Sequence, residues 1–184
     1  QEYSQSLEAE SGYLPGGVGW YRKNFSLGEE AKGKRIRIDF DGVYMNATVY
    51  VNGKEVGTHP YGYTPFSFDI TDYISYDKEN TIAVKVDHQT PPSRWYSGSG
   101  IYRSVSLTTT NDVHVDLNGI KVESNNLAKE AGKTVNTDIK TTVVNDSKEA
   151  KNITVTHTVF KKGEKPDAAI GTFTTETQEI GAGK

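Results

Sequence analysis

Cysteine is absent from the 184 residues. The chain therefore has no disulfide, no thiolate metal site and no cysteine nucleophile. No apolar run approaches the roughly 20 residues that a membrane-spanning helix needs. The 21 Lys and Arg residues are mixed with 24 Asp and Glu residues, which gives a net charge of −3 and no basic block. Nucleic acid and membranes are therefore not expected as partners.

The sequence also lacks the short motifs of several enzyme classes. It contains no GxSxG elbow, no P-loop and no GxGxxG after a strand, and the glycine-rich SGSGIY leads into a strand pattern instead of a helix. No two of the four histidines have metal-ligand spacing, so no metal and no cofactor are expected. These histidines are His59, His88, His114 and His157. His88 opens the loop HQTPPSRW, where a polar loop residue is the favoured interpretation.

A pair of carboxylates suited to glycoside hydrolysis is missing as well. Such enzymes usually place two carboxyl groups about 5–10 Å apart. Asp39 and Asp41 flank Phe40 and would share one strand face. A solvated face or a turn cap explains them better than catalysis, because a lone acid pair is a weak motif.

Alternating polar and apolar residues dominate the first 110 positions and predict short strands. The runs are RIRIDF, ATVYV, FSFDI, NTIAVKV and IYRSVSL. RIRIDF puts Ile36, Ile38 and Phe40 on one face. Asn52-Gly53 is the signal of a two-residue hairpin turn in which both residues have positive φ. The pattern predicts an antiparallel sandwich or jelly roll for residues 1–110. Trp20, at the start of the run GWYRKNF, is expected in its core.

The composition changes near residue 110. All eleven tyrosines and both tryptophans lie before this point, and threonine and valine dominate after it. Four or five strand-like runs follow, among them DVHVDLNGIKV and NITVTHTVF. Residues 111–184 are therefore expected to form a partial immunoglobulin-like sandwich, since the full fold needs about seven strands. The chain begins with Gln1 and ends in EIGAGK, so we expect a piece of a longer protein, of unknown location but compatible with a secreted or cell-surface bacterial one.

The segment PPSRWYSGSG, residues 91–100, carries the strongest functional signal. Pro91-Pro92 restricts the backbone, which lowers the entropy lost when the loop presents side chains. Arg94 offers a planar fork of donors to hydroxyls or a carboxylate. Trp95 and Tyr96 can stack on the apolar face of a sugar. An aromatic cluster that plugs the end of the sandwich is the equally weighted alternative, because large aromatics serve cores and interfaces alike. The segment LPGGVG, residues 14–19, is expected at the same rim.

Several of these motifs, in this order, resemble one known family. GWYRKNF, IDFDGVYMNATVYVNGKEVGTHPYGYTPFSFDIT, NTIAVKV and SRWYSGSGIYRSVSL are similar to the N-terminal sugar-binding domain of glycoside hydrolase family 2, and most similar to bacterial β-galactosidases. The resemblance is strong over residues 19–107. It implies a galactose-binding-like jelly roll, then an immunoglobulin-like sandwich, then a TIM barrel that carries the two catalytic glutamates of a retaining mechanism. The barrel would be the partner of this chain. This chain would contribute Arg94, Trp95 and Tyr96 to substrate binding.

The resemblance also marks a departure from some large members of the family. Those members carry an aspartate for sugar and cation contact in a longer loop at this place. Residues 90–100 contain no acidic residue, so a metal role for this domain is in doubt.

Three functions remain open from the sequence. The chain is the non-catalytic N-terminal part of an exo-β-glycosidase, with a β-galactoside or related glycan as substrate. Alternatively it is an independent carbohydrate-binding module, in which the Arg94 loop binds sugar by itself. The third alternative is a structural spacer or subunit interface. The choice among galactoside, glucuronide and mannoside depends on barrel residues.

Overall fold

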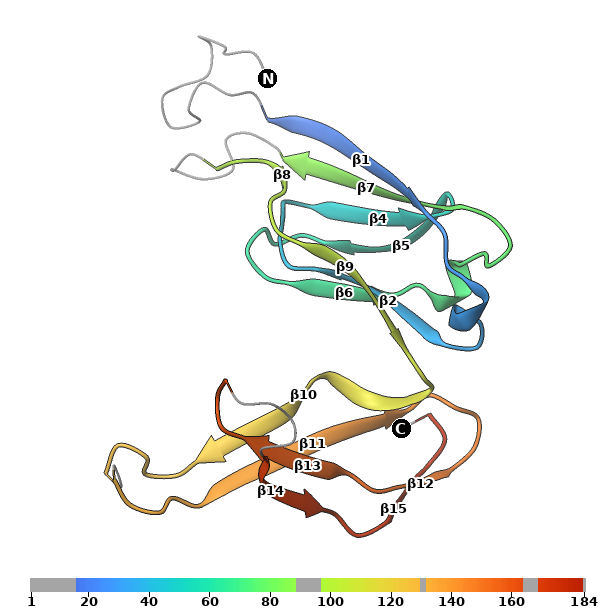
Figure 1. Cartoon of the computed structure of the whole chain (residues 1–184). Coiled ribbons are helices and arrows are strands. Elements are labelled where there is room, and N and C mark those ends of the chain that lie inside the picture. Colours follow the sequence, from blue (N-terminus) through green and yellow to red (C-terminus); the bar gives the residue numbers. More distant parts are fainter. Residues whose placement is uncertain (1–15, 89–96, 130–131, 164–168, 184) are drawn as a thin grey trace. The chain divides into compact units, whose positions relative to one another are not determined.

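The computed structural model describes residues 16–88, 97–129, 132–163 and 169–183. The chain divides into two compact units, residues 1–110 and 111–184, and each is described by itself (Figure 1). The described residues form β-strands and two short 3₁₀ turns, Glu29–Ala31 and Thr71–Tyr73. Within them no helix is long and apolar enough to cross a membrane. The prediction of an all-β chain is confirmed.

The first unit is a sandwich of antiparallel sheets. Its larger sheet has the strand order β1-β7-β4-β5 and its smaller one the order β6-β2-β9, while β3 and β8 form a short pair at one end. The strands of the larger sheet are β1 (Gly17–Phe25), β7 (Asn80–His88), β4 (Ala47–Val51) and β5 (Lys54–His59). The others are β6 (Phe66–Asp69), β2 (Arg35–Phe40), β9 (Val105–Thr110), β3 (Val43–Tyr44) and β8 (Gly100–Ile101).

The core of the first unit follows from the alternation of the sequence. Ile36, Ile38 and Phe40 point inward from β2 and are at most 1% exposed. Val49 and Val51 from β4, with Val84 and Val86 from β7, meet them from the other sheet. Burying such a side chain contributes about 1.5–3 kcal/mol. The shared face predicted for Ile36, Ile38 and Phe40 is therefore confirmed.

The turn between β4 and β5 is fixed by asparagine chemistry. Asn52 and Gly53 have φ angles of 51° and 79°, the left-handed conformations that a type I′ turn requires. The Asn52 side chain donates to Asn80 Oδ1 and accepts from the Thr81 N–H, at 2.8 and 3.0 Å. Asn80 is completely buried and also exchanges hydrogen bonds with the backbone of Ser75. The hairpin is thus anchored to the start of β7.

Trp20 does not lie in the core, contrary to the expectation. Its register partner on β7 is Lys85, whose side chain points away from the core, and 52% of Trp20 is exposed. The outward position follows from the pairing, because directly opposed residues of two strands share one face of a sheet. Tyr21, its neighbour in sequence, faces the other way.

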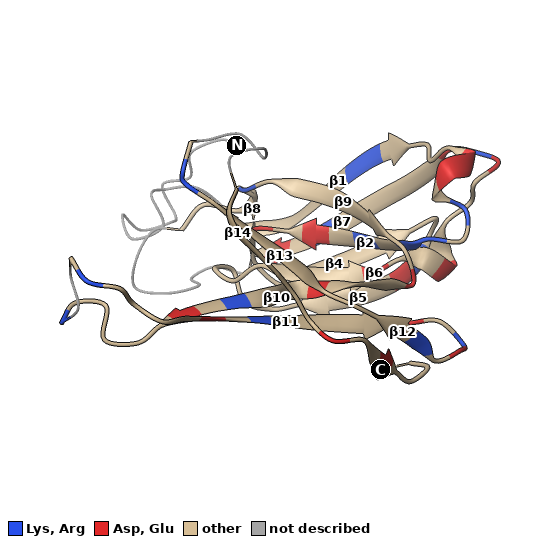
Figure 2. Cartoon of the chain, turned by 60° about the horizontal axis from the view of Figure 1, so that its bottom comes forward, with Lys and Arg blue, Asp and Glu red and all other residues tan. Residues whose placement is uncertain are grey.

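The described residues of the second unit form six strands in antiparallel pairs, more than the four or five counted from the sequence. The pairs are β10 (Val113–Ser124) with β11 (Thr137–Asn145), β12 (Lys151–Ile153) with β15 (Gln178–Ile180), and β13 (Thr156–Phe160) with β14 (Ala169–Thr174). Asn145 ties this unit together, because its side-chain nitrogen donates to the carbonyls of Glu149, Ile180 and Gly181. Acidic and basic side chains are interspersed along the strands (Figure 2).

Candidate functional site at the rim of the first unit

The candidate site lies at one end of the first sandwich, called the rim below, where β7 ends and β8 begins. The rim is defined by Tyr44, His88, Ser99 and Gly100, which hydrogen-bond, pair or pack with one another. The predicted sugar-contacting residues Arg94, Trp95 and Tyr96 lie outside the described residues. The structure therefore describes the frame that holds both ends of their loop.

His88 is the central side chain of this frame. It is the last residue of β7 and is 3% exposed, so the expectation of a polar loop residue is wrong. Its Nδ1 hydrogen-bonds with the hydroxyl of Ser99, on the far side of the loop. The ring of Tyr44 packs edge-on against the imidazole, with centroids 5.2 Å apart. A single buried side chain thus ties together the two ends of the segment that carries Arg94.

The electrostatic state of His88 follows from its burial. Burial lowers the pKa of the imidazole below its ordinary value, because the charged form is poorly solvated there. The other ring nitrogen, Nε2, is buried and has no hydrogen-bond partner among the described residues. The rim is therefore expected to hold a neutral imidazole at pH 7.

Three further tyrosines extend the rim outward. The ring of Tyr63 packs against Tyr44 at 5.2 Å, and Tyr61 packs against Tyr63 at 5.7 Å. Tyr102 donates its hydroxyl hydrogen to the carbonyl of Gly62 at 2.8 Å, which fixes the turn between Tyr61 and Tyr63. The rings of Tyr61 and Tyr63 are more than half exposed, so these two side chains form part of the protein surface.

A glycine-lined hollow of about 430 Å³ opens beside Ser99. The described part of the LPGGVG segment lies here, as expected from the sequence. Gly17 is the register partner of His88, which brings this segment to the rim. Gly100 has a φ of +110° and stands so close to the Tyr21 hydroxyl that a Cβ would collide with it. The hollow is lined by Gly16, Gly17, Val18, Gly19, Tyr21, Val86, Ser99 and Gly100.

The acid pair predicted to be non-catalytic is explained by its contacts. Asp39 accepts hydrogen bonds from Arg37, Ser67 and Thr108, each at 2.6 Å. Its partial burial would raise the pKa of the carboxyl, but these three bonds and the charge of Arg37 lower it overall. Asp41 is exposed and lies beyond the end of β2. The Asp39 carboxylate thus joins the strands of the smaller sheet, and nothing in its contacts suits proton transfer.

Across residues 16–88, 97–129, 132–163 and 169–183, no group of three or more His, Asp or Glu side chains is placed to hold a metal ion.

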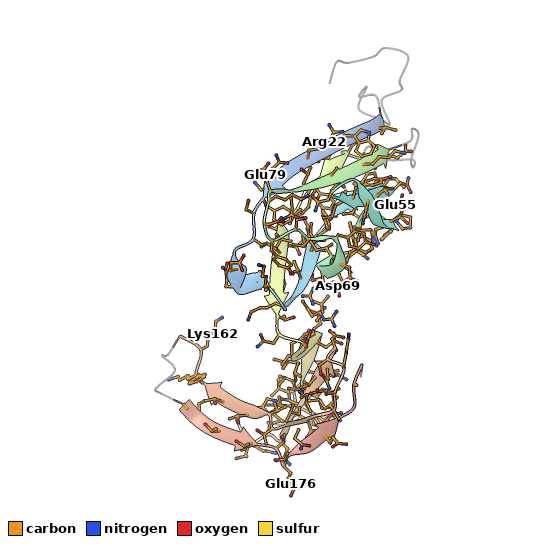
Figure 3. All side chains as sticks on the ribbon, turned by 90° about the vertical axis from the view of Figure 1, so that its right-hand side faces the viewer. Arg22, Glu55, Asp69, Glu79, Lys162 and Glu176 are labelled. Atoms are coloured by element: carbon orange, nitrogen blue, oxygen red, sulfur yellow. The ribbon has the colours of Figure 1, made fainter. Side chains whose placement is uncertain are left out.

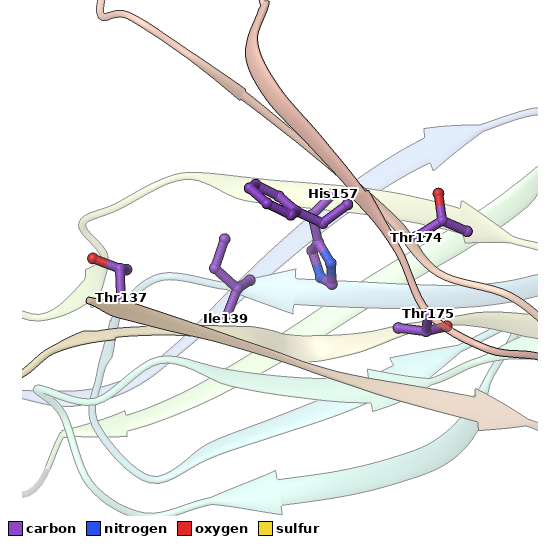
Figure 4. A pocket seen from close by; sticks show the side chains of 6 residues that line it. Thr137, Ile139, His157, Thr174 and Thr175 are labelled. Atoms are coloured by element: carbon purple, nitrogen blue, oxygen red, sulfur yellow. The ribbon is translucent and has the colours of Figure 1, made fainter. Parts of the chain in front are cut away.

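The second unit has a hollow of its own, of about 280 Å³ (Figure 4). Ile139 and Phe173 line it together with hydroxyl groups and His157. The His157 ring nitrogen Nε2 is hydrogen-bonded to Thr141 at 2.7 Å and is therefore occupied. No carboxylate among the described residues lines this hollow, so the hollow does not offer the acid pair that glycoside hydrolysis needs.

The described side chains of the rim can bind but have no means to cleave a glycosidic bond. Aromatic faces, hydroxyls and one neutral imidazole suit the apolar and polar sides of a sugar ring. Against this geometry, the family model described as "Glycosyl hydrolases family 2, sugar binding domain" matches residues 6–111. The chain belongs to glycoside hydrolase family 2.

Individual relatives agree with this membership. The β-galactosidase BoGH2A of Bacteroides ovatus is 48% identical over 145 residues, which is 78% of this chain and 17% of the relative. A crystal structure of a family 2 member from Bacteroides cellulosilyticus matches with a TM-score of 0.82 and 35% identity, over 95% of this chain and 23% of that one. The structure of a Bacteroides uniformis β-glucuronidase matches with a TM-score of 0.78 and 32% identity, over 92% and 21%. This family 2 chain thus spans less than a quarter of these relatives.

Sequence reasoning missed the part of the site that depends on pairing. The bond between His88 and Ser99 joins residues eleven positions apart, and no local pattern marks it. Tyr44 was not singled out, although the aromatic contacts of the rim converge on it. The one available signal was the position of His88 at the inward phase of the alternation in NTIAVKVDH, which predicts a buried side chain.

Proposed function

We propose that this chain is the non-catalytic N-terminal part of a retaining exo-β-glycosidase, and that the enzyme acts on β-galactosides. The observation that carries the proposal is the 48% identity to a β-galactosidase over 78% of this chain, within 17% of that relative. A catalytic TIM barrel on the same parent chain would be the partner of the rim, and a β-galactoside or related glycan its substrate.

The contacts of the described carboxylates favour a non-catalytic role for this chain. A retaining glycosidase needs an acid/base and a nucleophile with carboxyl groups about 5–5.5 Å apart. Asp39, the described member of the candidate acid pair that lies within a strand, already accepts three hydrogen bonds in its sheet. The two catalytic groups are therefore assigned to the parent barrel.

The rim would act by positioning. Arg94 would donate hydrogen bonds to sugar hydroxyls, and Trp95 and Tyr96 would stack on the apolar face of the ring. The loop that carries them begins directly after His88, whose bond to Ser99 holds its two ends together. Such preorganisation lowers the entropy lost on binding and so raises affinity.

The test is a comparison of variants in the full-length protein. We expect Trp95→Ala and Arg94→Ala to lower kcat/KM on an aryl β-galactoside roughly tenfold to hundredfold, as loss of a binding side chain in an active site does. Phe173→Ala removes an aromatic ring from an exposed position in the second unit and serves as the control. Unchanged kinetics in both rim variants would refute the positioning role.

The substrate is tested with two aryl glycosides that differ only in the sugar that is transferred. The named relatives include a β-galactosidase and a β-glucuronidase. We expect the aryl β-galactoside to be hydrolysed with the higher kcat/KM. A preference for the aryl β-glucuronide would overturn the galactoside assignment and leave the glycosidase assignment standing.

An independent carbohydrate-binding module is the second candidate, favoured by the exposed rings of Tyr61 and Tyr63 at the rim. Isothermal titration of the 184-residue chain with galactose and lactose separates the two. Saturable binding that Trp95→Ala abolishes favours the module. Absence of any binding that depends on Trp95, together with loss of parent activity in Trp95→Ala, favours the supporting role. No effect in either assay favours a spacer or a subunit interface.

A further inference from the structure

The outer face of the larger sheet carries an aromatic pair that the rim does not use. Trp20 on β1 and Tyr50 on β4 both flank β7, and their ring centroids are 5.6 Å apart with a tilt of 37°. The two rings meet across the middle strand because the β7 residue opposite Tyr50 is Ala83, whose side chain is a single methyl group. Two strands thus supply one shared aromatic surface.

This surface is open to solvent. Trp20 is 52% exposed and the neighbouring Val18 is 55% exposed. Both point away from the core, since their register partners Lys85 and Asp87 alternate with the buried Val84 and Val86. The pair is therefore separate from the rim, where His88 points inward from the next position on the same strand.

Charged groups of both signs surround the rings. Lys85 and Asp87 form an ion pair at 3.7 Å on β7, beside Trp20. Glu55 is the register partner of Tyr50 on β5. Desolvation raises the pKa of the Tyr50 phenol, and the charge and hydrogen bond of Glu55 raise it further. Arg22 is the next outward residue after Trp20 on β1. Figure 3 labels Arg22 and Glu55 on their strands.

A shallow hollow of about 280 Å³ continues this face toward β5. Thr48 and Thr58 contribute hydroxyl groups to its lining, and Lys85 and Asp87 contribute their charges. The aromatic pair is thus bordered by donors and acceptors within the span of a few strands.

We propose that the Trp20–Tyr50 pair is a surface binding site for a neutral hexose unit of a glycan, distinct from the rim. A pyranose presents a C–H face that stacks on aromatic rings and a ring of hydroxyls that both donate and accept hydrogen bonds. On the outer face of the sheet, the two aromatic rings can stack on the C–H face of the sugar. The polar side chains around the rings can bind its hydroxyl groups.

Charge balance selects a neutral sugar. Arg22 and Lys85 are matched by Glu55 and Asp87, so the surface has no excess charge to hold a uronate or a phosphate. The apolar part consists of the two rings and Ala83, and it is bordered by Val18, which also lines the hollow of the rim. This area is small for a stable protein partner. The family model described as a sugar-binding domain covers all of these residues.

The chain provides a direct probe of this site, because Trp20 and Trp95 are its two tryptophans. In a Trp95→Phe variant of the 184-residue chain, all tryptophan emission comes from Trp20. We expect titration with lactose and with a β-1,4-galactotetraose to change that emission saturably, and glucuronic acid to leave it unchanged. Tyr50→Ala in the same background is expected to weaken the apparent affinity about tenfold or more, as removal of a central aromatic contact does.

The controls separate binding from folding and from the rim. Ile170→Ala removes an exposed apolar side chain of the second unit and should leave the titration unchanged. Trp20→Phe, followed calorimetrically, should weaken binding without changing the melting temperature. Absence of any saturable change overturns the inference. An emission change that follows protein concentration instead of sugar overturns it too and identifies the face as a contact between copies. Because Trp95 is replaced throughout, failure of the rim assay leaves this inference intact.

Discussion

At the scale of single residues, the backbone of the rim requires glycine where a larger side chain would collide with its neighbours. Gly100 is the clearest case, because it combines a φ of +110° with the Tyr21 hydroxyl directly beside its Cα. Non-glycine residues rarely adopt this backbone region, and doing so costs of order 1–3 kcal/mol.

We therefore expect Gly100→Ala to lower the free energy of unfolding by roughly 1–3 kcal/mol, measured by denaturant titration. Gly98→Ala is the matched control, because open space surrounds Gly98. Adding Tyr21→Phe should recover part of the loss by removing the colliding hydroxyl. An equal effect of the two glycine variants would contradict this account.

His88 makes the stability of the first unit depend on pH. Burial lowers the pKa of His88 in the folded state below its ordinary value of 6.5, so the folded state binds fewer protons than the unfolded state. The stability that this group contributes is complete above that ordinary value and is lost as the pH falls through the folded pKa.

We expect the melting temperature to fall on acidification from pH 7 to pH 5, and to fall less in His88→Gln. His114→Gln, at a half-buried histidine of the second unit, controls for loss of any histidine. The measurement is a series of thermal melts followed by circular dichroism. Parallel pH profiles for wild type and His88→Gln would rule out His88 as the titrating group.

At the scale of elements, the β4–β5 hairpin depends on a residue outside it. Asn80 is completely buried, and its amide accepts from Asn52 and Ser75 and donates to the Ser75 carbonyl. Removing it takes these hydrogen bonds from the Ser75 backbone and from Asn52, although Asn52 keeps its bond to the Tyr73 carbonyl. Each buried group left unsatisfied costs about 1–3 kcal/mol.

Asn80→Ala is accordingly expected to destabilise the first unit by about 2–4 kcal/mol in urea unfolding. Asn152→Ala, at an exposed position of β12, should stay within about 0.5 kcal/mol of wild type. A change at Asn80 no larger than that at Asn152 would show that the hairpin holds without this anchor.

The sequence predicted elements well where one face of a strand is buried and the other is not. Ile36, Ile38 and Phe40 alternate with charged residues, so both their strand and their inward face could be read directly. Trp20 could not be placed this way, because every residue of β1 except Phe25 is exposed and the register with β7 alone decides which face is outward.

The site was predictable in part for a related reason. Proline, arginine and aromatics on one loop indicate a binding surface by composition, and the family resemblance led to the same loop. The frame that holds this loop arises from contacts between distant segments, such as Tyr44 with His88 and Tyr102 with Gly62. The pattern of residues along a single strand does not predict contacts between segments far apart in the sequence.

At the scale of the whole molecule, the two units differ in how much they bury. The cluster of buried hydrophobic residues lies entirely in residues 31–86, and the partly buried residues packed against it lie in residues 27–101. Among the described residues of the second unit, Asn145 is the one that is fully buried, and large apolar side chains such as Ile170 and Phe173 are more than 60% exposed.

Expressed alone, residues 1–110 are therefore expected to unfold cooperatively, and residues 111–184 to show a broad transition or none. Apolar burial is the main stabilising term, and the second unit has little of it. Separate thermal melts of the two pieces, compared with the 184-residue chain, give the measurement. A sharp transition in residues 111–184 would show that the second unit has enough core of its own.

The position of β1 has one more consequence. In the sheet order β1-β7-β4-β5 it is the outermost strand, so the backbone groups along its free side face no strand within the described part of the chain. Such an edge can recruit a strand from another molecule. Arg22 and Lys23 place adjacent positive charges there, and mutual repulsion between copies opposes that addition. Replacing both with threonine should convert a freely dissolved protein into one whose light scattering rises with concentration and time.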